Sequence, residues 1–178
     1  RYVLTSNAPE TKDNDFTWAD FQARNNNELV AIFGNFINRV TVLTHKYYDG
    51  VTPSEGTLSQ IDIKTLETVR AYPAVIESSI ERYRFREAQQ ELMNVARLGN
   101  KYLAEQEPWK TIKTDQARTK TVMFVALQIA SALAILSEPF LPHTSKKLKK
   151  MLHINSRETQ NGLQWSDVAT KQTLIAPG

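Results

Sequence analysis

The sequence has no cysteine, and glycine, proline and histidine are scarce in its 178 residues. The lack of cysteine excludes disulfides, thiol catalysis and zinc sites built on cysteine. The six glycines and seven prolines are too few for a low-complexity or fibrous chain. His45, His143 and His153 have no metal-ligand spacing and no catalytic nucleophile beside them, so we expect neither a metal site nor a catalytic triad.

Membrane-spanning and secretory patterns are missing as well. The longest apolar run, residues 122–136, is interrupted by Gln128 and Ser131 and is shorter than the roughly 20 residues that cross a bilayer. The first residue is not Met, and no basic-then-apolar signal pattern follows it. We therefore predict an internal fragment of a larger cytoplasmic protein with no membrane partner, in which residues 122–136 form a buried helix.

Sequence signatures of catalysis are also lacking. The chain has no glycine-rich phosphate-binding loop and no nucleophile with a converging base. Its net charge of +3 is compatible with a polyanionic partner, although many proteins without such a partner are equally basic. Binding is therefore the class of function that remains.

Helical periodicity dominates what is present. Between Trp18 and Tyr48, apolar residues recur at alternating intervals of four and three, which predicts one long amphipathic helix that ends at Asp49-Gly50. The expected buried seam of this helix is Leu29, Phe33, Phe36, Val40, Leu43 and Tyr47. No segment of useful length alternates with a period of two, so strands are not expected.

Two further helices are predicted in the middle of the chain. One begins near Thr57 and contains Pro73, which should kink or end it because proline lacks the backbone donor. The other runs from about Arg84 to Gln106 and stops before Pro108. Its seam includes Gly99, where a neighbouring backbone could approach closely.

The last two predicted helices complete an all-α bundle of about five helices, the natural architecture for this pattern. Thr114-Asp115 can cap a helix that continues to Leu136. After Pro139 and Pro142, Thr144 or Ser145 offers a cap for a short Lys-rich helix to about His153. The remainder of the chain is expected to be a polar tail with an isolated Trp165.

A polar flank of the long helix is the first candidate for a binding surface. At about 100° per residue, Asn35, Arg39 and Lys46 fall together beside the apolar seam. Asn pairs a donor with an acceptor, Arg offers a planar fork of donors and Lys a mobile charge, so the three can contact base edges and phosphates. The spacing alone favours an ordinary solvated face.

Trp109 is the second candidate, because it directly follows Pro108 at the predicted end of a helix and lies outside the helical seam. An exposed indole there could stack on an unpaired RNA base. The alternative is that Trp109 packs over the end of the bundle as a lid.

Two other groups invite a functional interpretation. Lys146, Lys147, Lys149 and Lys150 could follow a phosphate backbone or could simply be a solvated face. The aromatic residues Phe16, Trp18 and Phe21 are interpreted as packing that fixes the start of the long helix to a preceding segment.

Several short motifs are spread along the chain. They are Ser6-Asn7-Ala8-Pro9-Glu10, Asp15-Phe16-Thr17-Trp18 with Phe21, Arg24 with Asn26-Asn27-Glu28-Leu29, Gly34-Asn35 with Arg39, Asn100-Lys101-Tyr102, Glu105-Gln106 with Pro108-Trp109, and Glu138-Pro139-Phe140-Leu141-Pro142-His143. Together they strongly resemble methionyl-tRNA synthetases just downstream of their catalytic domain, and the last motif is similar to a turn shared among related class I synthetases. The resemblance covers roughly residues 1–145 and fades in the tail.

The resemblance implies a helical domain that binds the CAU anticodon of tRNA(Met). It implies that Trp109 stacks on an anticodon base while Asn35 and Arg39, one helical turn apart, contact bases. Pro108 and Lys46 are possible supporting residues, and the C-terminal lysines have no counterpart in the resemblance. No catalytic residue or metal ligand is implied in this chain.

The resemblance also implies a division of the chain. Residues 1–20 are the junction from an absent catalytic domain, residues 21–153 the helical anticodon-binding domain and residues 154–178 a C-terminal tail. ATP, and possibly zinc, would belong to the catalytic portion, so this fragment is expected to hold no cofactor and not to aminoacylate. That catalytic portion is the second expected partner besides the anticodon stem-loop.

Two alternatives stay open. The chain could be the equivalent domain of a class I synthetase for another aliphatic amino acid, against which the Gly34-Asn35 and Pro108-Trp109 pairs argue. It could also be a helical protein-interaction module that uses the same exposed residues to contact a protein.

Overall fold

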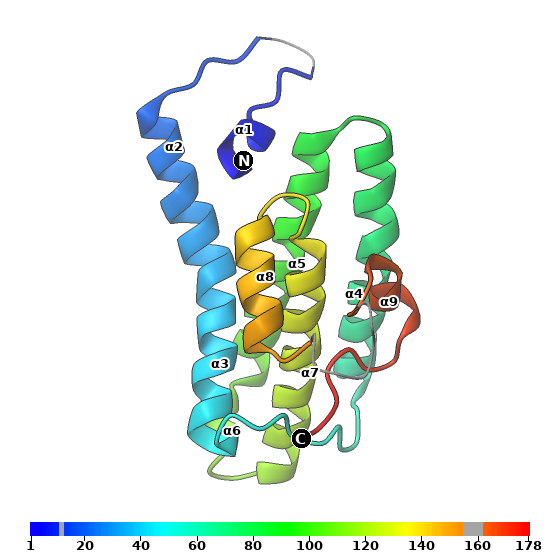
Figure 1. The fold of residues 1–178 in the computed structure, drawn as a ribbon. Coiled ribbons are helices and arrows are strands. Elements are labelled where there is room, and N and C mark those ends of the chain that lie inside the picture. The colour runs from blue at the N-terminus through cyan, green and yellow to red at the C-terminus, as the bar shows by residue number, and fades with distance from the viewer. Residues whose placement is uncertain (11–12, 155–161) are drawn as a thin grey trace.

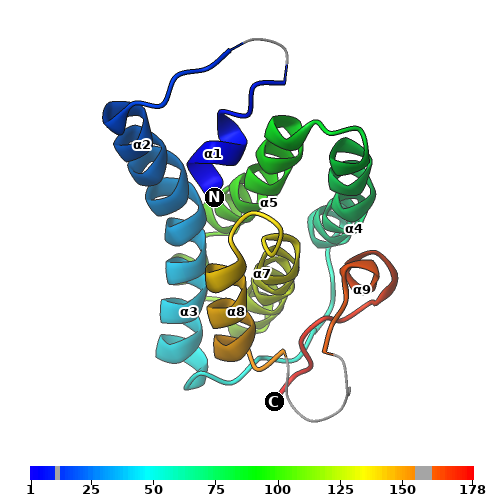
Figure 2. The same ribbon diagram turned by 45° about the horizontal axis from the view of Figure 1, so that its top comes forward.

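The computed structural model describes residues 1–10, 13–154 and 162–178, which fold into an all-α bundle with no strand in those ranges. Figures 1 and 2 show long helices packed side by side, with α7 in the middle. The all-α prediction is therefore confirmed, and five principal helical segments carry the architecture. The elements are α1 (Tyr2–Ser6), α2 (Trp18–Arg24), η1 (Asn25–Gly34), α3 (Asn35–Tyr48), α4 (Gln60–Glu81), α5 (Phe85–Gln106), α6 (Pro108–Thr111), α7 (Gln116–Leu136), α8 (Pro142–Met151) and α9 (Trp165–Thr170).

The predicted long helix is present as the unbroken series α2, η1 and α3, but its middle third is π-helical. A π-helix closes its hydrogen bonds over five residues instead of four, which shifts the side chains around the axis. Phe33, Phe36 and Val40 are buried as predicted, whereas Leu43 and Tyr47 are only half-buried. Thr44 is buried in their place because it lies one turn beyond Val40 and donates its hydroxyl to the Val40 carbonyl at 2.8 Å.

Helix α7 is the centre of the bundle. The side chain of Asp115 accepts a hydrogen bond from the backbone N–H of Arg118, so the predicted cap is confirmed. Every residue from Thr121 to Leu136 is buried. In the described part of the chain α7 is the one helix long and apolar enough to cross a membrane, and 94% of its most apolar window is buried inside the fold, as in the core helix of many globular proteins.

Helix α4 runs from Gln60 to Glu81 through Pro73, so the helix does not end there, which was one of the two predicted outcomes. The start is firmly fixed by a capping box between Ser59 and Asp62. Pro73 is buried, and its carbonyl accepts a hydrogen bond from the Trp165 indole at 3.3 Å. Packing around the buried Pro73, including that of α9, therefore outweighs the missing backbone donor.

Gly99 on α5 sets how closely α3 and α5 approach. A Cβ added at Gly99 would lie 2.5 Å from the Phe36 ring, so the close neighbour is this side chain and not the backbone that was predicted. We expect Gly99→Ala to lower the free energy of unfolding by about 1–3 kcal/mol through overpacking. Chemical denaturation measures this change. Ala71→Gly, at an exposed position in α4, measures the difference in helix propensity between alanine and glycine, which favours Gly99→Ala and so cannot explain a loss of stability. Equal stability of Gly99→Ala and the unsubstituted chain would contradict the packing argument.

Helix α8 starts earlier than predicted, because Pro142 occupies its first turn, where a missing N–H costs nothing. Neither Thr144 nor Ser145 caps it. The Ser145 hydroxyl is buried and instead donates to the Ala134 carbonyl of α7 at 2.6 Å.

The prediction of a polar tail over residues 154–178 is wrong for its described part, and residues 155–161 lie outside the described ranges. Trp165 begins helix α9, which packs on α4 and carries the buried Val168. Gln128 of α7 holds the segment that follows, accepting from the Leu174 N–H at 2.7 Å and donating to the Ile175 carbonyl at 2.9 Å. The C-terminal segment is thus part of the bundle (Figure 2).

Candidate nucleic-acid interface

The chain reverses direction between α5 and α7 through a short turn that carries Trp109. Glu107 ends α5 and begins α6 in the left-handed conformation, with φ 43°. Pro108 follows at the first position of α6, where its fixed φ suits a helix start, and it is buried. Because both residues before Trp109 have a restricted backbone, the direction in which the chain leaves α5 is constrained.

Trp109 and Arg39 lie in direct contact. The central guanidinium carbon of Arg39 is 5.2 Å from the centroid of the indole, within the range of a cation–π contact. The Trp109 side chain is half-buried and packs on the edge of the core. Trp109 is therefore neither fully exposed, as expected of a free stacking surface, nor fully buried, as expected of a lid. Part of the residue stays accessible beside the Arg39 guanidinium.

Asn35 lies one helical turn before Arg39 and is exposed. Its Nδ2 donates to Oδ1 of Asn100 at 2.8 Å. Asn100 in turn donates to the carbonyls of Ile32 and Ala96, at 2.9 and 3.1 Å, so its own amide cannot rotate without losing two bonds. Asn100 therefore orients Asn35 and leaves the Asn35 Oδ1 as an acceptor for a ligand. Asn100 belongs to the Asn100-Lys101-Tyr102 motif, but nothing in the sequence indicated this role for it.

The structure thus brings Asn35, Arg39 and Trp109 onto one surface, formed by α3, the end of α5 and α6. Lys46 lies on the same flank of α3 about two helical turns beyond Arg39. Lys46 is exposed, and its Nζ lies 5.5 Å from the centroid of its neighbour Tyr47, not at Trp109.

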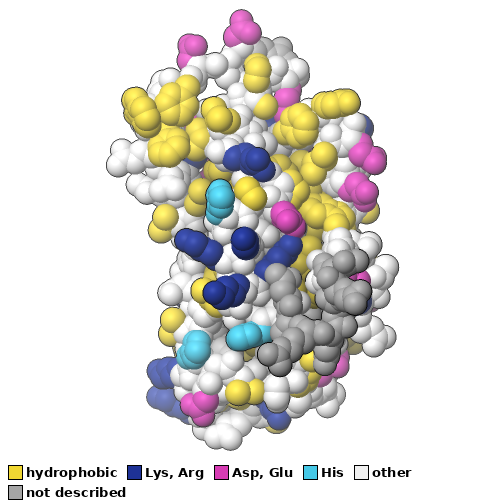
Figure 3. Space-filling view, in the orientation of Figure 1, with side chains coloured by type: hydrophobic (Ala, Val, Ile, Leu, Met, Phe, Trp, Pro, Cys, Tyr) yellow, Lys and Arg dark blue, Asp and Glu magenta, His cyan; other side chains and the backbone are white. Residues whose placement is uncertain are grey.

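The lysines of α8 lie on a different surface. In Figure 3 a group of basic side chains covers the face of α8 that is turned to the viewer. Lys149 is paired with Glu138 at 2.7 Å, while Lys146, Lys147 and Lys150 are exposed. Because α8 borders the opposite flank of α3, this cluster is not continuous with Trp109.

A buried polar cluster behind the Trp109 turn was not anticipated. Asp62 is 0% exposed and accepts hydrogen bonds from both terminal nitrogens of Arg118 and from the Tyr102 hydroxyl, the latter at 2.6 Å. Arg118 also donates to Oε1 of Gln106 at 2.7 Å. Burial by itself would raise the pKa of Asp62, but the hydrogen bonds from Arg118, Tyr102 and Ser59 outweigh it and lower that pKa to about 2. Asp62 is therefore ionised at neutral pH.

The aromatic residues at the start of α2, which were predicted to fix the long helix to a preceding segment, are not part of the core of this chain. Phe16, Trp18 and Phe21 are 49%, 77% and 42% exposed and contact mainly one another, with ring centroids 5.2–6.2 Å apart. Hydrophobic side chains gather at this end of the molecule in Figure 3. The end that carries α6 and Trp109 is the opposite one in Figure 1.

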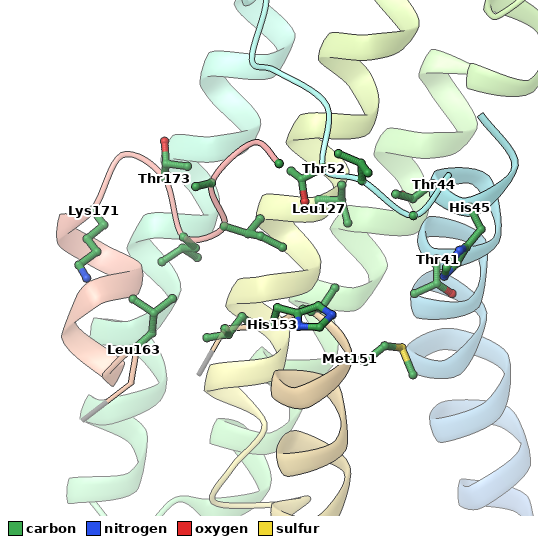
Figure 4. Close-up of a pocket in the computed structure, with 18 residues that line it drawn as sticks. Thr41, Thr44, His45, Thr52, Leu127, Met151, His153, Leu163, Lys171 and Thr173 are labelled. Atoms are coloured by element: carbon green, nitrogen blue, oxygen red, sulfur yellow. The ribbon is translucent and has the colours of Figure 1, made fainter. Parts of the chain in front are cut away.

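A separate pocket of about 770 Å³ lies between α3, α8 and the C-terminal segment (Figure 4). Thr41, Thr44 and His45 line it from α3, Met151 from the end of α8, and His153 from the residues that follow α8. It therefore opens on the flank of α3 that faces away from Asn35 and Arg39. Over the described ranges, no group of three or more His, Asp or Glu side chains is placed to hold a metal ion.

Two family models match the chain. The model for the anticodon binding domain of methionyl tRNA ligase matches residues 52–178, and the model for class I tRNA synthetases of the methionine type matches residues 1–41. The match extends through the C-terminal segment, so the prediction that the resemblance fades after residue 145 is wrong.

Curated relatives and solved structures agree with these matches. The chain is 70% identical to a methionine–tRNA ligase of Christiangramia forsetii and 67% identical to one of Flavobacterium psychrophilum, in both cases over 100% of its own length. It spans about a quarter of the length of these relatives, 26% and 25%. Methionyl-tRNA synthetase of Mycobacterium tuberculosis with bound methionyl-adenylate has the same fold, with a TM-score of 0.87, 25% identity, and coverage of 99% of this chain and 34% of that one.

Proposed function

Because the chain belongs to the family of anticodon-binding domains of methionyl-tRNA ligase, we propose that it binds the CAU anticodon loop of tRNA(Met) through Trp109, Asn35 and Arg39. The contact between Arg39 and Trp109 on an accessible surface is the observation that carries this proposal. It joins a stacking surface to a fork of hydrogen-bond donors, the combination that recognises unpaired bases in RNA.

Each of the three residues has a distinct role in the proposed complex. An anticodon base stacks on the indole of Trp109. The Arg39 guanidinium, already held at the ring, donates to the edge of a base or to a phosphate. Asn35 accepts from a base through its Oδ1, because its amide nitrogen is engaged by Asn100. Lys46 is proposed to contact the phosphate backbone only, and Pro108 acts by fixing the backbone next to Trp109.

The rest of the proposal concerns the larger protein. We propose that the whole protein is a cytoplasmic methionine–tRNA ligase in which catalysis, ATP and any zinc belong to a portion other than this chain, and that this chain by itself does not aminoacylate. The exposed cluster of Phe16, Trp18 and Phe21 then packs against the catalytic portion. Support comes from the match of residues 1–41 to the synthetase model, since this range contains the whole aromatic cluster.

A binding titration with RNA stem-loops tests the proposed function. Stem-loops of identical sequence except for the anticodon, one CAU and one with all three bases changed, are titrated at two salt concentrations. The CAU stem-loop should bind more tightly, and the ratio of the two dissociation constants should persist at the higher salt, because base contacts depend less on counterion release than phosphate contacts do. Equal binding of both stem-loops would leave only nonspecific electrostatics and would favour the protein-interaction alternative.

Replacing Arg39 with alanine is expected to reduce discrimination between these stem-loops. Loss of one bidentate base contact corresponds to about 1–3 kcal/mol, or roughly a five- to 150-fold smaller ratio of dissociation constants. Lys46→Ala is the matched control: it should weaken both stem-loops equally and leave their ratio unchanged. An unchanged ratio in Arg39→Ala would remove Arg39 from base recognition.

A further inference from the structure

The turn that carries Trp109 is held at both of its ends by side chains that the proposed function does not use. At its start, Gln106 is the last residue of α5, and its Oε1 accepts from Arg118 of α7 at 2.7 Å. At its end, the hydroxyls of Thr111 and Thr119 lie 2.8 Å apart in a hydrogen bond, again between the turn and α7. Trp109 lies between these two anchors.

The first anchor is unusually well fixed. Both terminal nitrogens of Arg118 donate to Asp62, so the guanidinium has one orientation in which it can also reach Gln106. Asp62 is completely buried and is held by the capping box at the start of α4 and by Tyr102 of α5. Three helix ends therefore meet at one buried carboxylate.

We propose that the network of Asp62, Tyr102, Arg118 and Gln106 is a positioning device that fixes the Trp109 indole beside Arg39 for base stacking. Trp109 is the third residue after Gln106, so its orientation depends on how the end of α5 is held. The contact with Arg39 joins α6 to α3, and a shift of the turn by a few ångströms would break it. This inference rests on the proposed function for its effect on binding, but its effect on the ring can be measured without RNA.

Gln106→Met tests the device without unfolding the protein. Methionine keeps the helix propensity and the length of the side chain but removes the acceptor of Arg118, and it leaves the buried pair of Asp62 and Arg118 intact. Thr111→Val removes the second anchor in the same conservative way. Gln128→Met is the matched control, because it removes a more deeply buried glutamine that holds the C-terminal segment instead of the turn.

The first readout is the mobility of the indole in the free protein. The chain has three tryptophans, so Trp18→Phe with Trp165→Phe leaves Trp109 as the single one, and excitation beyond the absorption band of tyrosine selects it. In this background, Gln106→Met should increase the amplitude of nanosecond indole motion in anisotropy decay and raise acrylamide quenching about twofold, whereas Gln128→Met should change neither. An unchanged indole in Gln106→Met overturns the inference, whatever happens to binding.

The second readout is affinity for the CAU stem-loop. Gln106→Met should weaken it about three- to tenfold, and Gln128→Met should leave it unchanged even if its melting temperature falls further. If the indole becomes mobile while the affinity stays the same and Trp109→Ala still weakens binding, the orientation of the ring does not matter and the inference is wrong. If Trp109→Ala binds normally, the proposed function fails, and the mobility measurement still decides whether the network fixes the ring.

Discussion

Trp109→Ala is expected to weaken binding of the CAU stem-loop by about 1–3 kcal/mol, which corresponds to roughly a five- to 150-fold rise in the dissociation constant. The substitution removes the stacking surface and also releases Arg39 from its contact with the ring. Fluorescence anisotropy of a labelled stem-loop measures the change. Far-UV circular dichroism should keep its helical amplitude, because α6 is a single turn at the edge of the bundle.

Trp18→Ala is the matched control for this experiment. It removes an indole that is 77% exposed from the start of α2, at the opposite end of the molecule in Figure 1. Its stem-loop affinity should equal that of the unsubstituted chain. Since Trp109 packs partly on the core, Trp109→Ala should also lower the melting temperature by a few degrees. Trp109→Phe keeps more of this packing, and a large loss of stability with unchanged affinity in both Trp109 variants would establish the lid interpretation instead.

Helix boundaries were predictable from the sequence where a local signal determines them. Asp115 caps α7 through a bond to a residue three positions away, and Asp49 and Gly50 adopt positive φ at the end of α3. Such signals need only neighbouring residues. The continuation of α4 through Pro73 could not be predicted in this way, because it depends on packing against α9, a segment distant in the sequence.

The candidate site was predictable only in part, for a related reason. The spacing placed Asn35 and Arg39 on one flank, but nothing in the spacing brings Trp109 to them, and this came from the family resemblance. The role of Asp62 could not be predicted at all. In the sequence, Ser59 and Asp62 form an ordinary capping pattern. In the structure the same carboxylate also accepts from Arg118, and no sequence pattern predicts a pair between residues so far apart.

Arg118→Met should produce the largest loss of stability of any variant considered, about 3–5 kcal/mol at neutral pH, because it leaves the carboxylate of Asp62 buried without a cation. Urea denaturation measures the free energy of unfolding. Lys101→Met, which breaks an exposed pair with Glu105 at 3.8 Å, is the control and should change it by less than about 1 kcal/mol.

The dependence on pH identifies Asp62 as the cause of this loss. In the unsubstituted chain the pKa of Asp62 is lowered from 3.8 to about 2, so the stabilisation from its ionised form, about 2 kcal/mol, is complete above about pH 4 and disappears as the pH falls through about 2. Without Arg118, burial raises the pKa of Asp62, and the variant is least stable, relative to the unsubstituted chain, at neutral pH. The difference between the two proteins should therefore shrink as the pH falls, first through the raised pKa of Asp62 in the variant and then on to about pH 2.

Adding Asp62→Asn to Arg118→Met separates the cost of a buried charge from the loss of a contact. The double variant has no buried ion, so it should be more stable than Arg118→Met alone at neutral pH. Its difference from the unsubstituted chain should widen between about pH 2 and 4 and then stay constant, whereas that of Arg118→Met should continue to widen above about pH 4. A double variant as unstable as the single one, with the same pH profile, would mean that Arg118 stabilises the helix ends through packing and Gln106 instead of through the charge of Asp62.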